Sequence, residues 1–269
     1  MKKTNTDVVE KRVSLLKQFQ ILDTLPEKEY DDITRLAAFI CNTPISLVTL
    51  LDDKRQFFKS HYGLKTKQTP IEHSFCAHAI NKTTKVFIVE DAKKDKRFKN
   101  NPLVTSKPNI VFYAGVPLIS EEGVPLGTLC VIDNKPHVLN TEQLLSLQAL
   151  ANQVMQLLIL RRKNIEITES EKIINQETEQ LNNIIEATRV GTWEWNLQTR
   201  EVNINERWAN IIGYTLDELH PINEKTIYNF IHPDDIALSD EKLKESLEKK
   251  ATFYDVDFRL KHKKGHYVW

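Results

Sequence analysis

Three residues whose side chains bind metals or act as nucleophiles lie close together in the stretch HSFCAHAI, residues 73–80. They are His73, Cys76 and His78. Imidazole and thiolate groups are ligands of zinc, copper and haem, and a thiolate of low pKa is also a nucleophile. The stretch therefore raises two chemical hypotheses, a metal site and a reactive thiol.

The spacing of these three residues argues against a metal site. On a helix each residue turns by about 100°, so Cys76 and His78 point in different directions while His73 and Cys76 share a face. On a strand, Cys76 and His78 share a face and His73 lies on the other. Tetrahedral zinc also needs a fourth ligand. We therefore expect no metal, a buried Cys76 and histidines at the surface.

Two other groups of polar residues invite a metal or haem hypothesis. Asp91, Asp95 and Arg97 follow an apolar stretch in EDAKKDKRF, where aspartates usually cap turns. We expect turn caps and an ion pair there. His232 precedes Pro233 at the start of a helical pattern, and this position is typical of a helix cap and not of a haem ligand.

The composition restricts the partners and the compartment. The chain has 269 residues, of which 41% are hydrophobic and 28% charged, with a formal net charge of zero. Without a basic excess we expect no nucleic-acid partner. The longest apolar run, ISLVTLL, is far shorter than the roughly 20 residues of a membrane span, so we expect no membrane segment. Three widely spaced cysteines favour a reducing compartment, and we expect a cytoplasmic location.

The first half of the chain alternates between helical and strand patterns. We expect helices and strands in the following order: helix 7–22, helix 27–42 with Pro26 in its first turn, strand 43–53, strand 55–63, short helix 73–80, strand 85–92, strand 109–119 and strand 124–133. Gly123 lies in the turn between the last two strands, where a positive φ favours glycine.

A long helical pattern follows, from Asn140 to about Ala187, with no glycine or proline inside it. Asn140 and Gln143 have the spacing of a capping box. Apolar residues recur at every seventh position in the second half of this helix, which predicts a contact with a second helix. We call this set the dimer seam; it consists of Leu160, Ile167, Ile174 and Leu181.

The last part of the chain has shorter patterns. We expect strands at 192–199 and 201–205, a helix at 206–215 that Gly213 ends, a helix at 231–250, and a strand, basic turn and strand over 252–269. The final strand has no partner after it, and an unpaired apolar edge is unfavourable. We therefore expect the chain to be part of a longer protein.

Two resemblances rest on these stretches. Residues 11–160 resemble a GAF domain of the bacterial sensor type, through ISLVTLLDDKRQFFKSHYGL, HSFCAHAI, VFIVEDAKKDKRFKNNPLV and FYAGVPLISEEGVPLGTLCVID. Residues 180–269 resemble a PAS domain, through GTWEWNLQT, NERWANIIGYTLDEL, IHPDD and FRLKHKKGHYVW. The helix between them is similar to the signalling helices that join sensor modules in dimers.

The resemblance implies an α+β fold of two α/β sensor domains, each a central antiparallel sheet flanked by helices. It divides the chain into a GAF domain (1–160), a signalling helix (161–187) and a C-terminally truncated PAS domain (188–269). It implies a homodimer and a sensor histidine kinase as the whole protein, with a response regulator as its downstream partner. The chain itself carries no catalytic motif, so we expect no catalytic residue in it.

The same resemblance indicates where a small molecule of unknown identity would bind. In the GAF domain we expect the pocket at Phe58, Cys76, Phe112 and Tyr113. In the PAS domain we expect a cavity at Trp195, Trp208 and Tyr214. We expect no metal and identify no cofactor.

Alternatives of other classes remain. A diguanylate cyclase or phosphodiesterase uses the same input modules, although no GGDEF or EAL stretch occurs here. A bilin pigment would need a cysteine directly followed by histidine, and Ala77 separates Cys76 from His78. A flavin photosensor would need a cysteine within 180–269, where none occurs. A GAF enzyme that reduces methionine sulfoxide would use cysteines, but Cys41 and Cys130 lie in apolar patterns typical of a core.

Overall fold

The computed structural model describes residues 5–81, 86–248 and 253–269. The chain divides into two compact units, Met1–Ser170 and Glu171–Trp269, which are described separately here. The first expected residue of strand 85–92 and the last two of helix 231–250 lie outside the described residues, as does the start of the segment 252–269.

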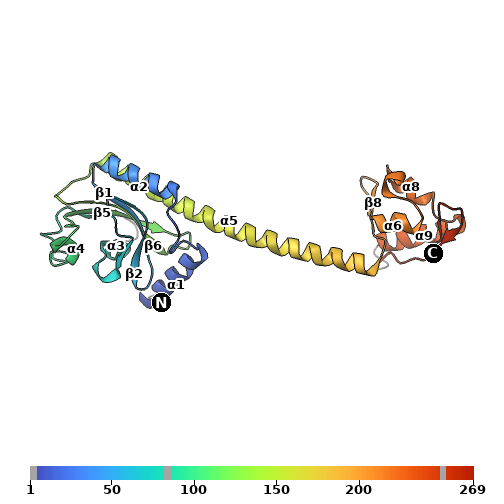
Figure 1. Cartoon of the computed structure of the whole chain (residues 1–269), viewed down its shortest axis with the longest axis horizontal. Helices are drawn as coiled ribbons and strands as arrows, with labels where there is room; N and C mark the ends of the chain where they lie inside the picture. Colours follow the sequence, from blue (N-terminus) through green and yellow to red (C-terminus); the bar gives the residue numbers. More distant parts are fainter. Residues whose placement is uncertain (1–4, 82–85, 249–252) are drawn as a thin grey trace. The chain divides into compact units, whose positions relative to one another are not determined.

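The first unit is built on a six-stranded antiparallel sheet with the strand order β3-β2-β1-β6-β5-β4 (Figure 1). Its strands are β1 (Ile45–Leu51), β2 (Arg55–Tyr62), β3 (Gln68–Pro70), β4 (Phe87–Val89), β5 (Phe112–Ile119) and β6 (Pro125–Asp133). The two central strands, β1 and β6, are buried along their whole length. This burial explains their almost continuous apolar sequence, because both faces of the sheet are covered.

Helices cover the two faces of this sheet. One apolar core contains residues from α1 (Asn5–Gln18), α2 (Lys28–Cys41) and the first part of α5 (Thr141–Thr188). The other contains residues from α3 (Phe75–Ala79) and α4 (Pro102–Thr105). The short helix η1 (Ile71–His73) comes directly before α3. The capping box at the start of α5 is confirmed, because Asn140 Oδ1 accepts from Gln143 N at 2.9 Å and Gln143 Oε1 from Asn140 N at 3.0 Å.

The dimer seam is largely exposed within the described chain. Its four residues, Leu160, Ile167, Ile174 and Leu181, are 55%, 55%, 60% and 61% exposed. Farther back on the same helix, Leu147, Val154 and Leu158 are fully buried in the first unit. The contact with a partner helix stays a prediction. It requires that the dimer seam be exposed in a single chain, as it is here.

By length and composition, α5 also passes the test for a membrane-crossing helix, with one window of mean hydropathy 1.2 of which 28% is buried. The run ISLVTLL, which the sequence analysis took as the longest apolar stretch, is strand β1. Length and composition alone are weak evidence for a span, since the core helix of a globular domain meets the same criteria. The burial of Leu147 and Val154 in the first unit accounts for the apolar residues at the start of α5.

The second unit has short elements around a small apolar core. They are β7 (Trp193–Asn196), β8 (Glu201–Ile204), α6 (Glu206–Ile211), α7 (Leu216–Leu219), α8 (Glu224–Tyr228), α9 (Pro233–Leu247), β9 (Leu260–Lys261) and β10 (Tyr267–Val268). The described strands form two antiparallel pairs, β7–β8 and β9–β10. The core centres on Trp208, Ile212 and Leu219. Gly213 follows α6 with φ +84°, as its position predicts.

Some boundaries differ from the expectations. The helix expected at 7–22 ends at Gln18. Pro26 lies before the N-cap residue Glu27 and so outside the first turn of α2. The strand expected from residue 252 is reduced to Leu260–Lys261, because Asp255 and Asp257 are poor strand formers. Helices α7 and α8 were not expected, and each begins with a capping box too short to predict a helix alone.

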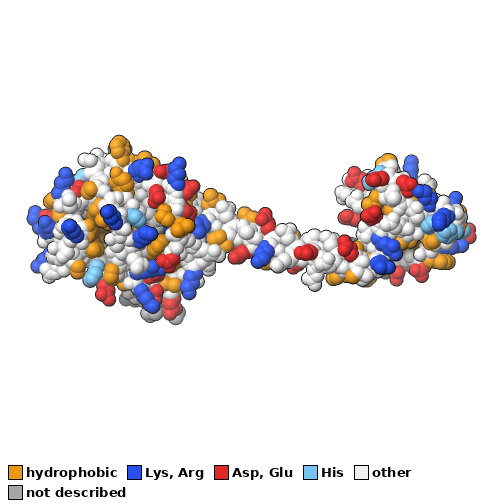
Figure 2. Space-filling model, viewed as in Figure 1, with side chains coloured by type: hydrophobic (Ala, Val, Ile, Leu, Met, Phe, Trp, Pro, Cys, Tyr) orange, Lys and Arg blue, Asp and Glu red, His pale blue; other side chains and the backbone are white. Residues whose placement is uncertain are grey.

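Charged side chains of both signs are interspersed over the visible face of the first unit (Figure 2). This distribution agrees with the formal net charge of zero. The visible face offers no continuous basic surface of the kind that binds nucleic acid.

Candidate functional site

The first unit contains a cavity of about 230 Å³ between the sheet and the α3 face. Its wall comes from five strands, from α3 and α4, and from the loops beside them. The lining residues are Leu47, Gln56, Phe58, Leu64, Thr66, Thr69, Phe75, Cys76, Leu103, Lys107, Pro108, Ile110, Tyr113, Cys130 and Ile132. Most of these side chains are apolar, and the polar ones gather near Cys76, as the contacts below show.

The placement of Cys76 follows from how α3 begins. Ser74 caps the helix, since its Oγ accepts from Ala77 N at 3.1 Å, and the same Oγ donates to Gln56 Oε1 on β2. The helix is therefore fixed against the sheet, with Cys76 turned inward and 1% exposed. His78 lies on the exposed side, and its ring stands at 78° to that of Phe98 with the two ring centroids 4.9 Å apart.

Four hydrogen-bond donors converge on the sulfur of Cys76. Thr128 Oγ1 donates at 3.0 Å, Gln56 Nε2 at 3.1 Å, Tyr113 OH at 3.2 Å and Thr49 Oγ1 at 3.4 Å. Cys130 lines the same cavity. A neutral thiol is a weak acceptor with a proton of its own, so four donors around one sulfur favour a thiolate.

These contacts act on the pKa of Cys76 in opposite directions. Burial raises it, but the hydrogen bonds from Cys130, Thr128, Thr49 and Tyr113 outweigh burial and lower the pKa to about 6. Burial and the neighbouring Cys76 raise the pKa of Cys130 well above its usual value. The two shifts have opposite directions, so Cys76 ionises more readily than Cys130.

The structure brings three of the four expected GAF-site residues to the cavity. Phe58, Cys76 and Tyr113 line it. Phe112 does not, because neighbouring residues of a strand point to opposite faces; it lies in the other core, with its ring 5.1 Å from that of His137. Binding of a ligand by these residues stays a prediction.

Sequence reasoning missed most of the polar groups around the sulfur. Thr49, Gln56 and Thr128 lie in strands that read as apolar or mixed, and their convergence depends on strand register. Cys130 was expected in the core, and it is fully buried there, but it also lines the cavity. One signal was present in the sequence, since Thr128 and Cys130 are two positions apart and so share a face of β6.

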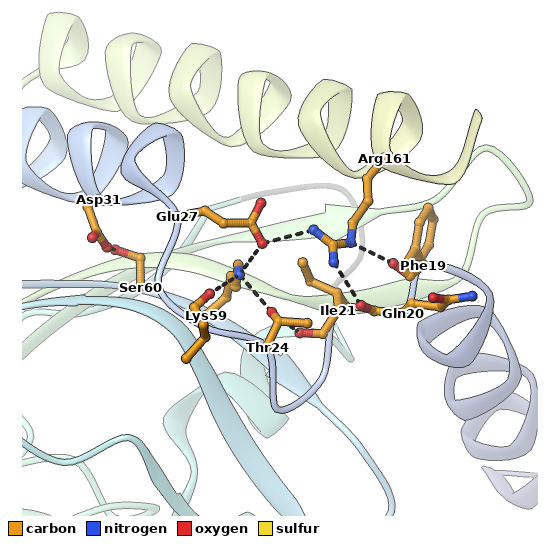
Figure 3. Close-up of polar contacts among 10 residues, drawn as sticks. Phe19, Gln20, Ile21, Thr24, Glu27, Asp31, Lys59, Ser60 and Arg161 are labelled. Atoms are coloured by element: carbon orange, nitrogen blue, oxygen red, sulfur yellow. Dashed lines mark hydrogen bonds and ion pairs between the residues drawn. The ribbon is translucent and has the colours of Figure 1, made fainter. Parts of the chain in front are cut away.

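One strand connects this cavity with the long helix α5. On β2, Phe58 faces the cavity, and the next residue, Lys59, points to the other side, where its Nζ lies 5.3 Å from the Tyr30 ring centroid. The Lys59 side chain is fully buried, and Nζ donates to Thr24 Oγ1 at 2.7 Å, to Leu25 O at 2.8 Å and to Glu27 Oε1 at 2.5 Å (Figure 3).

Glu27 joins this lysine to α5. Its Oε1 also accepts from Arg161 Nη1 at 2.8 Å (Figure 3). The same guanidinium donates to Phe19 O at 2.9 Å and to Gln20 O at 3.1 Å. The segment between α1 and α2 is therefore held from both sides, by Lys59 of the sheet and by Arg161 of the helix. We call Lys59, Glu27 and Arg161 the α5 tether.

The second unit has a smaller cavity, of about 50 Å³. Trp195 and Trp208 line it as expected, together with Tyr228, Ser239 and residues around them. Tyr214 does not line it; its ring lies 5.4 Å from that of Phe230, and Lys263 Nζ lies 5.3 Å from its ring centroid. The cavity is too small for most cofactors.

The expected caps are confirmed. Asp95 forms an ion pair with Arg97 at 2.5 Å, and Asp91 Oδ1 accepts from Lys93 N at 3.1 Å. His232 caps α9, since its Nδ1 accepts from Asp234 N at 3.2 Å. His262 and His266 have the H-x-x-x-H spacing, and their rings stack with the centroids 4.4 Å apart. Among the described residues no group of three or more His, Cys, Asp or Glu could hold a metal ion.

Two family models match this chain. Residues 26–158 match the GAF domain model, and residues 201–269 match the PAS fold model. The first match contains the cavity around Cys76 and the α5 tether except for Arg161. The second begins at β8 and contains most of the residues around the smaller cavity.

Two curated proteins are similar to parts of the chain. A cyclic di-GMP phosphodiesterase of Pseudomonas aeruginosa is 43% identical over 125 residues, which are 46% of this chain and 21% of that protein. The aryl hydrocarbon receptor nuclear translocator homolog of Drosophila melanogaster is 33% identical over 66 residues, which are 24% of this chain and 10% of that protein. The chain therefore spans only 21% and 10% of the length of these two relatives.

Among solved structures, the chain is similar to the GAF domain from an Acinetobacter phosphoenolpyruvate-protein phosphotransferase. The identity is 17% and the TM-score is 0.43, with 59% of this chain and 95% of that chain covered. No ligand or activity is transferred from that protein.

Proposed function

Because the chain contains a GAF domain followed by a PAS-fold domain, we propose that its cavity around Cys76 receives a small molecule and that α5 carries the signal onward. The chain is a signalling input region. The observation that supports this proposal is the path from cavity to helix. Phe58 of β2 lines the cavity, and the neighbouring Lys59 reaches Arg161 of α5 through Glu27.

The mechanism is a shift between two arrangements of the α5 tether. A molecule in the cavity changes the position of β2, and the buried Lys59 follows because its three acceptors leave it little freedom. Arg161 then changes its hydrogen bonds to the segment between α1 and α2. A ligand moves such an equilibrium only by its difference in affinity for the two arrangements.

The first candidate for the whole protein is a sensor histidine kinase with a response regulator downstream. The succession of GAF domain, signalling helix and PAS domain supports it. The second candidate is an enzyme of cyclic di-GMP metabolism, and the similarity to the Pseudomonas phosphodiesterase over 125 residues supports it. Reading the gene beyond codon 269 separates the two, because a phosphoacceptor histidine helix and a cyclic di-GMP domain have different sequences.

We further propose a homodimer through the dimer seam and a cytoplasmic location. The exposure of Leu160, Ile167, Ile174 and Leu181 supports the dimer. Free cysteines at positions 41, 76 and 130 support a reducing compartment.

Native mass spectrometry of the freshly purified chain, combined with hydrogen exchange, tests the proposed function. We expect a bound small molecule that is lost in Leu47→Phe, because the larger side chain fills the cavity. Loss of the molecule should increase exchange at residues 19–27 and along α5 near Arg161.

The control is Leu36→Phe, which enlarges a side chain of α2 that is 50% exposed and should change neither the bound mass nor exchange at residues 19–27. Equal exchange at residues 19–27 in the parent chain and in Leu47→Phe would contradict the proposed path, provided that circular dichroism shows both to be folded.

A further inference from the structure

Two thiols whose pKa values are shifted in opposite directions line the GAF cavity. Cys76 and Cys130 both line it, and the Cys76 sulfur accepts from Thr128 Oγ1 at 3.0 Å, two residues before Cys130 on the same face of β6. They come from different elements, α3 and β6, and lie 54 residues apart in the sequence. This juxtaposition goes beyond what a binding pocket requires, and it supplies the two thiols that a disulfide needs.

We propose that Cys76 is a modification site, a thiolate that small hydroperoxides oxidise and that Cys130 then converts into a Cys76–Cys130 disulfide. This inference rests on the proposed function, in which a small molecule enters the cavity, and it names hydroperoxides as the class of that molecule. The reaction itself is measurable without any signalling readout.

The donors around the sulfur carry this inference. Thr128 Oγ1, Gln56 Nε2, Tyr113 OH and Thr49 Oγ1 lie between 3.0 and 3.4 Å from Cys76 Sγ. They stabilise the thiolate, which is the nucleophilic form of cysteine. Cys41 provides the contrast within the same domain, since it is equally buried but burial raises its pKa to about 11.

The cavity selects the size and charge of the oxidant. Cys76 is 1% exposed, so a reactant reaches its sulfur through the cavity of about 230 Å³. Apart from Lys107 and the proposed thiolate of Cys76 itself, the residues that line this cavity carry no charged side chain. A small neutral molecule such as hydrogen peroxide or an alkyl hydroperoxide fits both conditions.

The first step forms one bond and breaks one. The Cys76 thiolate attacks the terminal oxygen of the hydroperoxide, the O–O bond breaks, and the sulfur takes the hydroxyl group as a sulfenic acid. The leaving alkoxide, or hydroxide from hydrogen peroxide, takes up a proton and departs as an alcohol or water. Tyr113 OH and Thr128 Oγ1 lie at the sulfur and can donate to that oxygen. The sulfur loses two electrons, and the peroxide gains them.

In the second step the Cys130 sulfur attacks the Cys76 sulfenic sulfur. The S–O bond breaks, the hydroxyl leaves with the proton of Cys130 as water, and the disulfide forms. The raised pKa of Cys130 suits this order of events, because Cys76 ionises more readily and reacts with the peroxide first.

The test treats the full chain with hydrogen peroxide at pH 7 and maps the thiols by mass spectrometry. We expect a Cys76–Cys130 disulfide in the parent chain, with Cys41 still reduced. In Cys130→Ser, Cys76 should stop at the sulfenic acid, which dimedone traps. The rate at Cys76 should rise between pH 5 and 7 and then level off, because the thiolate is fully formed above its lowered pKa.

Thr128→Val removes the nearest donor and should slow oxidation of Cys76 about tenfold at pH 6, which is the effect of one hydrogen bond to a charged group. Thr43→Val, a buried threonine whose hydroxyl bonds only Ile45 O at 3.4 Å, is the matched control and should leave the rate unchanged.

Equal oxidation rates at Cys76 and Cys41 would overturn the inference. So would a dimedone adduct that is absent from Cys130→Ser while circular dichroism shows the variant folded. Neither result would bear on the proposed function, which the bound mass and hydrogen exchange test separately. Conversely, a disulfide that forms without any change of exchange in α5 would support the chemistry and contradict the signalling path.

Discussion

Gly127 is the position in the GAF sheet where a single methyl group has the least room. It lies on β6 opposite Leu50 of β1, and a Cβ there would lie 1.8 Å from Thr49 O. That oxygen belongs to the backbone of a buried strand and has no space to move. Gly127→Ala should therefore destabilise the GAF domain by at least about 3 kcal/mol, measured by urea unfolding with circular dichroism.

The contrasting substitution is Gly123→Ala. Nothing lies within 4 Å of a Cβ at this position, but the residue has φ +73°. The cost is then the backbone strain alone, about 1 kcal/mol. Equal stability losses for the two variants would contradict the close approach of β1 and β6 at Gly127.

Asp235 makes the stability of the PAS domain depend on pH in the acidic range. Arg259 binds it through Nε at 2.9 Å and Nη2 at 2.6 Å and lowers its pKa to about 2. Since this pKa is below that of an unfolded aspartate, about 3.9, the stabilisation is present above pH 4 and is lost as the pH falls from 4 toward 2. Asp235→Asn should remove this part of the acid sensitivity.

Tryptophan fluorescence measures this effect selectively, because all four tryptophans, Trp193, Trp195, Trp208 and Trp269, lie in the second unit. Urea midpoints at pH 5 and pH 2.5 should differ less in Asp235→Asn than in the parent chain. The exposed Asp217→Asn is the control and should keep the full difference; if it behaves like Asp235→Asn, the effect does not come from the pair with Arg259.

Single residues near the site were the hardest to predict from sequence. Cys76 was expected to be buried and Phe58 and Tyr113 to border a pocket, and the structure places them so. Phe112 was placed on the wrong face of the sheet, because adjacent aromatic residues on a strand give no sign of which one faces the pocket. The donors to the sulfur depend on contacts between distant strands, which no local pattern encodes.

At the scale of elements, the α5 tether is the feature that joins sheet and helix. Arg161→Ala removes three hydrogen bonds, to Phe19 O, Gln20 O and Glu27 Oε1. Arg161 and Glu27 are 27% and 34% exposed, so water replaces part of the loss. We expect a destabilisation of about 1–2 kcal/mol, with faster hydrogen exchange over residues 19–27.

Lys163→Ala is the control for this prediction. Lys163 lies two residues farther along α5 and is exposed, so its loss should change neither stability nor exchange. Exchange at residues 19–27 that is unchanged in Arg161→Ala would contradict the role of the α5 tether in holding this segment.

Long elements were predicted well because their patterns repeat many times. The helix from 140 to about 187 is α5, which ends at Thr188, and the hairpin around Gly123 is β5–β6. The elements that were missed are short. Helices α4, α7 and α8 have four or five residues each, less than the repeat needed to show a helical period. Caps and tertiary packing form them, and neither is visible in a window of a few residues.

At the scale of the whole molecule, the proposed homodimer depends on the dimer seam. Four apolar residues at heptad spacing, each more than half exposed in one chain, are costly to leave in water. A second copy of the helix covers them if the two chains align in parallel. The double variant Ile167→Asp, Ile174→Asp places charges in that contact and should raise the dimer dissociation constant at least about 100-fold.

Sedimentation equilibrium of the full chain at micromolar concentrations measures this change. The matched control is Gln176→Asp, Asn183→Asp, which adds the same two charges to α5 at exposed positions outside the dimer seam. It should leave the parent association unchanged, because both side chains would then face water. A parent chain that sediments as a monomer, or a control that dissociates as readily as the seam variant, would contradict pairing through these residues, and signal transfer through α5 would then have to occur within a single chain.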